Sequence, residues 1–100
     1  MDNYNVLIAP AAQSDLLGVM EYIATLIPEE AARYNELFMA EAETLRTTPK
    51  SCPFARDPQL RLRGYRTLAV EDYIFFFVMN GSTVEIRRIL YAKRQYDRLA

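Results

Sequence analysis

Apolar positions recur at helical spacing through the first half of the chain, after a short run of branched residues. Residues 5–9 form that run, which predicts a buried strand. Apolar side chains then recur every three or four positions over residues 11–27 and again over 28–47, which predicts two amphipathic helices. Pro28 ends the first helix and fits the first turn of the second, so we expect an antiparallel helical hairpin with almost no loop.

From residue 65 onward the period changes to two, which is typical of β-strands. Three strands are predicted, at residues 65–70, 73–79 and 82–91. The middle segment is apolar on both faces, so we expect it to be the central strand. Residues 48–60 contain three prolines and are predicted to be a loop, and residues 93–99 are predicted to be a short tail of one or two helical turns.

The turns between these strands are short enough for an antiparallel meander. Glu71-Asp72 predicts a tight turn, and Asn80-Gly81 is the strongest short hairpin signal because both central positions of a type I′ turn need positive φ. The element order is β-α-α-β-β-β. It predicts one α+β domain over residues 1–100, an antiparallel sheet with the helical hairpin on one face.

Composition narrows the chemistry open to this chain. Its 100 residues fit one domain, and no apolar run approaches the ~18 residues of a membrane span. The polar N-terminus does not resemble a signal peptide, so we expect a cytoplasmic protein without membrane contact. The sequence has no histidine and a single cysteine, Cys52, which argues against a catalytic triad, a metal site or a bound cofactor.

The net charge of −1 hides a division between the two halves of the chain. Residues 1–47 carry eight acids and two bases, whereas residues 48–100 carry five acids and ten bases. The ten bases are Lys50, Arg56, Arg61, Arg63, Arg66, Arg87, Arg88, Lys93, Arg94 and Arg98. Because most of them are arginines in or beside predicted strands, we expect one flat positive face that binds phosphate or carboxylate groups. The alternative is that both halves are ordinary solvated surface.

The last predicted strand carries the candidate chemistry. Its side chains alternate between two faces, and the helices should cover the more apolar one, which leaves Arg87 and Tyr91 on the open face. Arg88 falls on the covered face. It must therefore be buried and paired there, unless a β-bulge between Arg87 and Arg88 re-aims one of them.

A convergent site is predicted on the open face. Arg66 should approach Arg87 and Tyr91 across the central strand, with Arg63 and Arg94 at the edge, close enough to hold one phosphate or carboxylate. The arginines would favour the phenolate form of Tyr91 and so prepare this side chain for proton transfer.

The alternative to a convergent site is a set of structural contacts. In that case Arg66 pairs with Glu85, Arg88 is buried, and Tyr91 and Tyr96 only pack the tail against the sheet. Cys52 lacks a histidine to activate it, so a nucleophilic role is disfavoured.

The ordered set of motifs resembles the RelE/ParE superfamily of toxins from bacterial type II toxin–antitoxin systems. The matching segments are residues 10–16 (PAAQSDL), 22–23 (YI), 64–68 (GYRTL), 72–77 (DYIFFF) and 84–94 (VEIRRILYAKR). No single segment is specific, but together they span nearly the whole chain in the expected order. The resemblance implies a toxin that inhibits growth when free, a cognate antitoxin as partner, plasmid stabilization, and contact with operator DNA only through the antitoxin.

The superfamily divides into two activities. RelE-like members are ribosome-dependent mRNA endonucleases that hold phosphates with basic residues on the sheet, whereas ParE-like members inhibit DNA gyrase and lack that set. Arg66 matches the shared arginine, but Ile74 stands where an endonuclease is expected to carry another arginine. The segment 88–94 is more similar to the ParE version, in which the position of Tyr91 is commonly histidine.

The resemblance therefore favours a ParE-like inhibitor of DNA gyrase. The alternative is a RelE-like, metal-independent mRNA endonuclease acting on the ribosome, and a third possibility is a degenerate toxin that only binds its antitoxin. The residues assigned to an active or binding surface are Arg66, Arg87 and Tyr91 as catalytic candidates, and Arg63, Arg88, Lys93 and Arg94 for target or phosphate binding.

Overall fold

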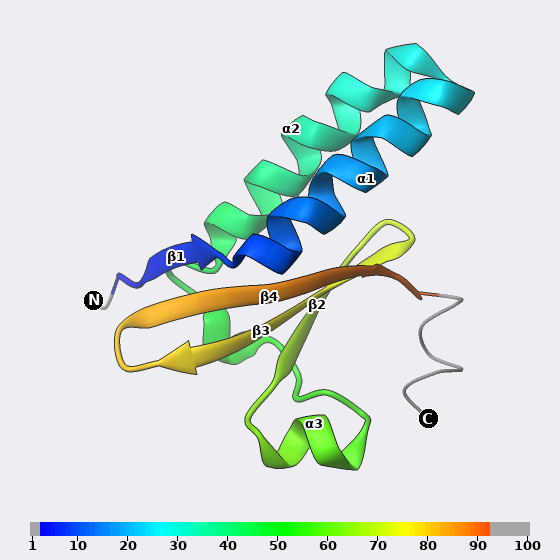
Figure 1. Ribbon diagram of the computed structural model, residues 1–100. Coiled ribbons are helices and arrows are strands. Elements are labelled where there is room, and N and C mark those ends of the chain that lie inside the picture. The colour runs from blue at the N-terminus through cyan, green and yellow to red at the C-terminus, as the bar shows by residue number, and fades with distance from the viewer. Residues whose placement is uncertain (1–2, 93–100) are drawn as a thin grey trace.

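Two long helices cover one face of a four-stranded sheet in the computed structural model, which describes residues 3–92 (Figure 1). The predicted α+β class is confirmed. In chain order the elements are β1 (Asn5–Ile8), α1 (Pro10–Leu26), α2 (Pro28–Thr44), a 3₁₀ helix (Pro49–Ser51), α3 (Pro58–Leu62), β2 (Arg66–Val70), β3 (Tyr73–Asn80) and β4 (Thr83–Tyr91).

The helical hairpin forms as predicted. A proline occupies the first turn of each helix, where its missing N–H costs no hydrogen bond. A single extended residue, Ile27, separates α1 from α2, and Glu29 and Glu30 lie in the first turn of α2 where the helix dipole favours acids. α2 ends at Thr44, three residues earlier than predicted.

The sheet has the strand order β1-β4-β3-β2, so β3 is an inner strand flanked by β2 and β4, as predicted. The meander β2-β3-β4 is antiparallel. The expectation of a wholly antiparallel sheet is wrong, because β1 pairs with β4 in parallel. The expectation that β1 is buried is also wrong. It is an edge strand in which Leu7 is 56% exposed, because only one neighbouring strand and one face cover it.

The proline-rich segment between α2 and β2 is more ordered than a loop. It contains the 3₁₀ helix and α3, each with a proline at its start, and α3 lies on the side of the sheet away from the hairpin (Figure 1). Between them the chain runs along β2, where Thr67 N–H donates to Pro53 O at 2.9 Å and Ala55 N–H to Tyr65 O at 2.9 Å. This pairing covers the outer edge of β2.

Phe38 of α2 lies at the centre of the core and is fully buried. Its ring packs edge-to-face on Phe75 and Tyr73 of β3, with ring centroids 5.2 and 5.7 Å apart. On the second face of β3, Ile74 and Phe76 are also buried, at 3% and 4% exposure. The second face of β3, which is predicted to be open, is therefore covered at these two positions.

Both hairpin turns place one residue at positive φ. Gly81 and Ser82 are the central residues of the β3–β4 turn, because Asn80 pairs with Thr83, and only Gly81 has positive φ (62°). This is the pattern of a type II′ turn, so the predicted type I′ turn centred on Asn80-Gly81 is wrong by one residue. In the β2–β3 turn Glu71 takes the same position at φ 57°.

Within residues 3–92 no helix is long and apolar enough to cross a membrane. The helical turns predicted for residues 93–99 lie outside the described residues.

Candidate functional site

A β-bulge interrupts β4 at the two adjacent arginines. Phe76 pairs with Arg88 and the next residue, Phe77, pairs with Ile86, so Arg87 has no partner across the strand pair. A bulge at this place is one of the two alternatives that the sequence leaves for Arg88, and the structure contains it. It turns the two guanidinium groups to different neighbours.

Arg88 pairs with Asp15 on α1. Its Nε and Nη2 donate to the two carboxylate oxygens at 2.7 and 3.0 Å, and this contact raises the pKa of Arg88. Asp15 Oδ2 also accepts the backbone N–H of Ile89 at 2.9 Å. The Asp15 side chain is 16% exposed and that of Arg88 50%, so the expected pairing exists, although Arg88 is half-exposed rather than buried. The contact lies where β1 no longer pairs with β4.

Arg87 pairs within its own strand. Its Nε and Nη2 donate to Glu85 Oε1 at 3.0 and 2.9 Å, which raises the pKa of Arg87, and its Nη1 donates to the Tyr65 hydroxyl at 3.4 Å. The expectation that Glu85 pairs with Arg66 is wrong, because Arg87 reaches the same carboxylate from two residues away.

Arg66 binds the segment that precedes α3. Its Nη1 donates to Cys52 O at 2.7 Å and to Lys50 O at 3.3 Å, and its guanidinium lies 4.0 Å from the centre of the Phe54 ring. Its register partner is Phe77, which belongs to the core beneath the helices. Arg66 therefore points to the helix side of the sheet rather than to the opposite face.

The three catalytic candidates are not brought together. Arg66 is level with Phe77, whereas Tyr91 is level with Tyr73, four residues along β3. At ~3.3 Å per residue and ~4.8 Å per strand spacing, this offset puts the two backbones about 16 Å apart. Arg87 lies beside Tyr65 and not beside Tyr91. Their catalytic roles remain a prediction.

Of the remaining candidate cations, the structure describes Arg63. Arg63 follows the last residue of α3 and is exposed, and Lys93 and Arg94 lie outside the described residues. Residues 3–92 hold no cluster of acids and cysteine suited to a metal ion. Cys52 is buried, and burial raises the pKa of its thiol despite the nearby Arg66, which disfavours the nucleophilic thiolate.

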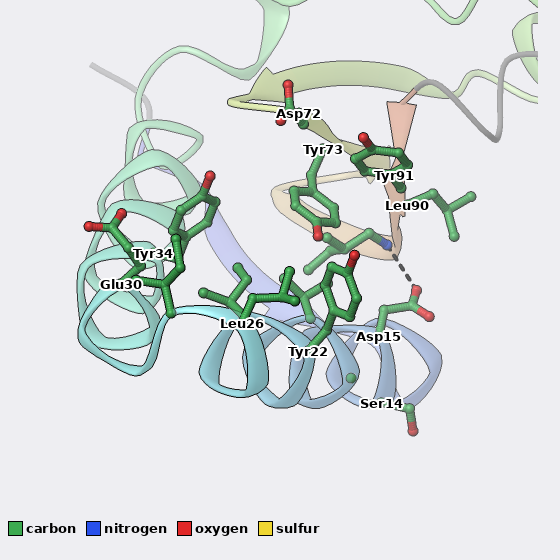
Figure 2. Close-up of a pocket in the computed structure, with 15 residues that line it drawn as sticks. Ser14, Asp15, Tyr22, Leu26, Glu30, Tyr34, Asp72, Tyr73, Leu90 and Tyr91 are labelled. Carbon is green, nitrogen blue, oxygen red and sulfur yellow. Dashed lines mark hydrogen bonds between the residues drawn. The ribbon is translucent and has the colours of Figure 1, made fainter.

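A groove of about 810 Å³ lies between the helical hairpin and the end of the sheet that carries Tyr73 and Tyr91 (Figure 2). Apolar side chains of α1 and β4 form much of its lining, and four tyrosines project into it. The tyrosines are Tyr22, Tyr34, Tyr73 and Tyr91, and the apolar residues include Val19, Ile23, Leu26 and Ile89. Large apolar surface is exposed here, because Tyr22 and Leu26 are each 60% exposed.

The charged side chains that line the groove within the described part of the chain are all acids: Asp15, Glu30 and Asp72. Asp15 is held by Arg88, and Glu30 accepts from Arg33 at 2.7 Å. Tyr73 lies between the sheet and α1 at 8% exposure (Figure 2). Burial, reinforced by the neighbouring tyrosines and Asp72, raises the pKa of Tyr73.

Comparison with known proteins identifies this architecture. The family model described as "ParE toxin of type II toxin-antitoxin system, parDE" matches residues 6–96. The chain belongs to the ParE toxin family. It is therefore the toxin of a type II toxin–antitoxin system, as the resemblance predicted, and it falls on the ParE side of the superfamily.

Fold comparison agrees with this assignment of the ParE toxin. A solved structure described as "Chromosomal ParDE TA system from P. aeruginosa" matches with a TM-score of 0.76 and 22% sequence identity, covering 88% of this chain and 95% of that one. At this identity the likeness shows the fold alone. No curated protein sequence matches the chain.

The groove of the ParE toxin is a site that the sequence interpretation missed. The available signal was an excess of apolar residues on α1, where Tyr22 and Leu26, which line the groove, are each 60% exposed after the helix has packed. A single core-facing stripe does not need these positions. Apolar side chains on α1 beyond those that pack on the core indicate a surface that a partner can cover.

Proposed function

We propose that this ParE toxin arrests growth by binding and inhibiting DNA gyrase, and that a separate antitoxin neutralises it. The supporting observation is how the arginines of the sheet are used. Arg66 binds backbone carbonyls, Arg87 binds Glu85 and Arg88 binds Asp15. Guanidinium groups committed in three directions are poorly placed to hold one scissile phosphate, so inhibition by surface contact is favoured over RNA cleavage.

The proposed antitoxin has a place to bind. The groove along the hairpin exposes more apolar surface than isolated side chains would, and patches of this kind mark interaction sites on soluble proteins. We expect an amphipathic segment of the antitoxin to lie in it, because a helix or strand with one apolar face buries such a groove efficiently.

The order in which cellular processes fail tests the target. After induction from a tightly repressed promoter, plasmid supercoiling and amino-acid incorporation are followed together. We expect supercoiling to fall first, and the purified chain to inhibit supercoiling by purified gyrase. Incorporation that stops first, with mRNA cut on purified ribosomes, would contradict the proposal and support the endonuclease. A chain that affects neither process would support the degenerate toxin.

A further inference from the structure

The end of the groove next to the β2–β3 turn carries a negatively charged side chain. Asp72 lines it, and within residues 3–92 its carboxylate has no ion pair. The turn that carries Asp72 is fixed at both sides: β2 pairs with β3, and Asp72 O accepts the N–H of Ala92 at 2.8 Å. The turn that carries this carboxylate is therefore held at the rim of the groove by backbone contacts.

Aromatic rings line the groove next to the turn that carries Asp72. Tyr73 and Tyr91 pack edge-to-face with ring centroids 5.5 Å apart, and Tyr22 approaches from α1 on the opposite side of the groove (Figure 2). Tyr91 is 39% and Tyr22 60% exposed, so both rings are accessible to a partner. The π-face of a tyrosine attracts a cation, and guanidinium groups stack on such rings while pairing with a carboxylate.

The local field has the same sign. The pKa of Tyr73 is raised by burial first and then by its neighbours, which include Asp72. Phenols are uncharged at neutral pH, so the carboxylate of Asp72 is the group in this set that repels an acidic side chain and attracts a cation.

We propose that the end of the groove formed by Tyr22, Tyr73, Tyr91 and Asp72 receives an arginine side chain of the antitoxin, while the apolar stretch of α1 receives the apolar residues of the same segment. This inference rests on the proposed antitoxin partner and does not depend on the target being gyrase. A positive group on the antitoxin is the opposite of what the flat positive face, predicted to bind phosphate or carboxylate groups, would select.

A titration with a minimal probe tests the pocket directly. The isotopically labelled toxin is titrated with N-acetyl-arginine methylamide, and in parallel with the neutral isostere N-acetyl-citrulline methylamide. NMR resonances of Tyr22, Tyr73, Tyr91 and Asp72 are followed. We expect saturable shifts at these four residues with the arginine probe, and binding weaker by about threefold or more with citrulline, the size of an exposed ion pair.

Variants assign the effect to this pocket. Asp72→Asn should weaken the arginine probe by about threefold, and Tyr91→Ala should weaken it further than Tyr91→Phe because the ring is lost. Glu36→Gln is the matched control, since Glu36 is an exposed acid of α2 outside the groove. Backbone amide spectra establish that each variant is folded.

Three results would overturn the inference: no shift at the four residues up to about 50 mM probe, equal response to citrulline, or equal binding by the Asp72 and Glu36 variants. The gyrase assay on the same wild-type preparation reports on the target separately. A toxin that binds arginine here and leaves gyrase untouched keeps this inference and loses the target proposal.

Discussion

Asp15 joins the first helix to the last strand through a single carboxylate. It accepts two hydrogen bonds from Arg88 and one from the backbone of Ile89. β1 pairs only as far as Ile86, so the carboxylate satisfies an N–H of β4 beyond the end of its neighbour. One residue thus covers part of a strand edge and anchors one end of the groove.

Asp15→Asn should lower the free energy of unfolding by about 1 to 2 kcal/mol, because charge-assisted hydrogen bonds to Arg88 become neutral ones. Urea denaturation followed by circular dichroism measures the change. Glu43→Gln removes the exposed ion pair between Glu43 of α2 and Arg46, and should lower the free energy of unfolding by less than about 0.5 kcal/mol. Equal costs for the two variants would mean that Asp15 is only a surface acid.

Tyr73 gives stability a dependence on alkaline pH. Its pKa is raised above the ordinary 10.0, so folding favours the protonated phenol. That contribution is fully present below the unfolded-state pKa of 10.0 and is lost as the pH rises through the higher folded-state pKa. Tyr73→Phe should therefore lose less stability than the wild type on going above pH 10.0. Denaturation series on both sides of that pH measure this.

At the scale of elements, the two hairpins of the meander solve the same turn differently. Gly81 supplies positive φ at no steric cost, whereas Glu71 holds a similar backbone conformation with a side chain. Strand pairing on both sides of each turn fixes that conformation. The β2–β3 turn, which holds Glu71 at positive φ, is therefore strained, whereas the β3–β4 turn with Gly81 is not.

Substitutions at these two turn positions should have opposite effects on stability. Glu71→Gly should raise the free energy of unfolding by about 0.5 to 1 kcal/mol, and Gly81→Ala should lower it by about 1 kcal/mol. No atom lies within 4 Å of a Cβ added at Gly81, so the loss would report backbone strain alone. Thermal unfolding of both variants decides, and a destabilised Glu71→Gly would show that the turn is not strained.

Arg66 connects β2 to the segment before α3 through its planar fork. Arg66→Lys keeps the charge but loses the Phe54 stacking and the fixed donor geometry, and should cost about 1 to 2 kcal/mol of stability. Chemical denaturation measures it. If the lysine variant were as stable as the wild type, this structural role would be contradicted. The result would then favour a role for Arg66 as a positive charge that binds phosphate.

At the scale of the whole molecule, the packed fold leaves an apolar groove exposed to solvent. The helices cover the sheet with Phe38 at the centre, but the outer part of the hairpin and the end of β4 leave a groove between them. Exposed Tyr22, Leu26 and Ile27 lie along it. A partner that buries this surface stabilises the folded toxin through mass action.

The antitoxin complex should therefore unfold at a much higher temperature than the free toxin. With free antitoxin about a thousandfold above its Kd, the stabilisation is about 4 kcal/mol, which for a domain of this size raises Tm on the order of 20 °C. Calorimetry at several antitoxin concentrations measures it. A Tm independent of antitoxin concentration would contradict binding to the folded toxin.

Local patterns accounted for the two long helices and the four strands, but not for the 3₁₀ helix and α3. Helical spacing around Pro28 predicted the hairpin, the apolar run 73–79 predicted the inner strand, and the adjacent arginines Arg87 and Arg88 offered a bulge as one alternative. These features depend on side chains a few residues apart, where steric and hydrophobic preferences act directly. The ordered motifs also indicated the RelE/ParE superfamily and favoured its ParE side, which the family comparison bears out.

Only the tertiary structure decided which distant segments meet. The parallel pairing of β1 with β4, the contact of Asp15 with Arg88 across 73 positions, and the offset between Arg66 and Tyr91 follow from register over the whole sheet. A one-residue difference in register changes every cross-strand neighbour, and no local pattern fixes it. The sequence alone therefore determined the elements and their family, whereas long-range pairing decided that the arginines disperse and that a groove opens beside them.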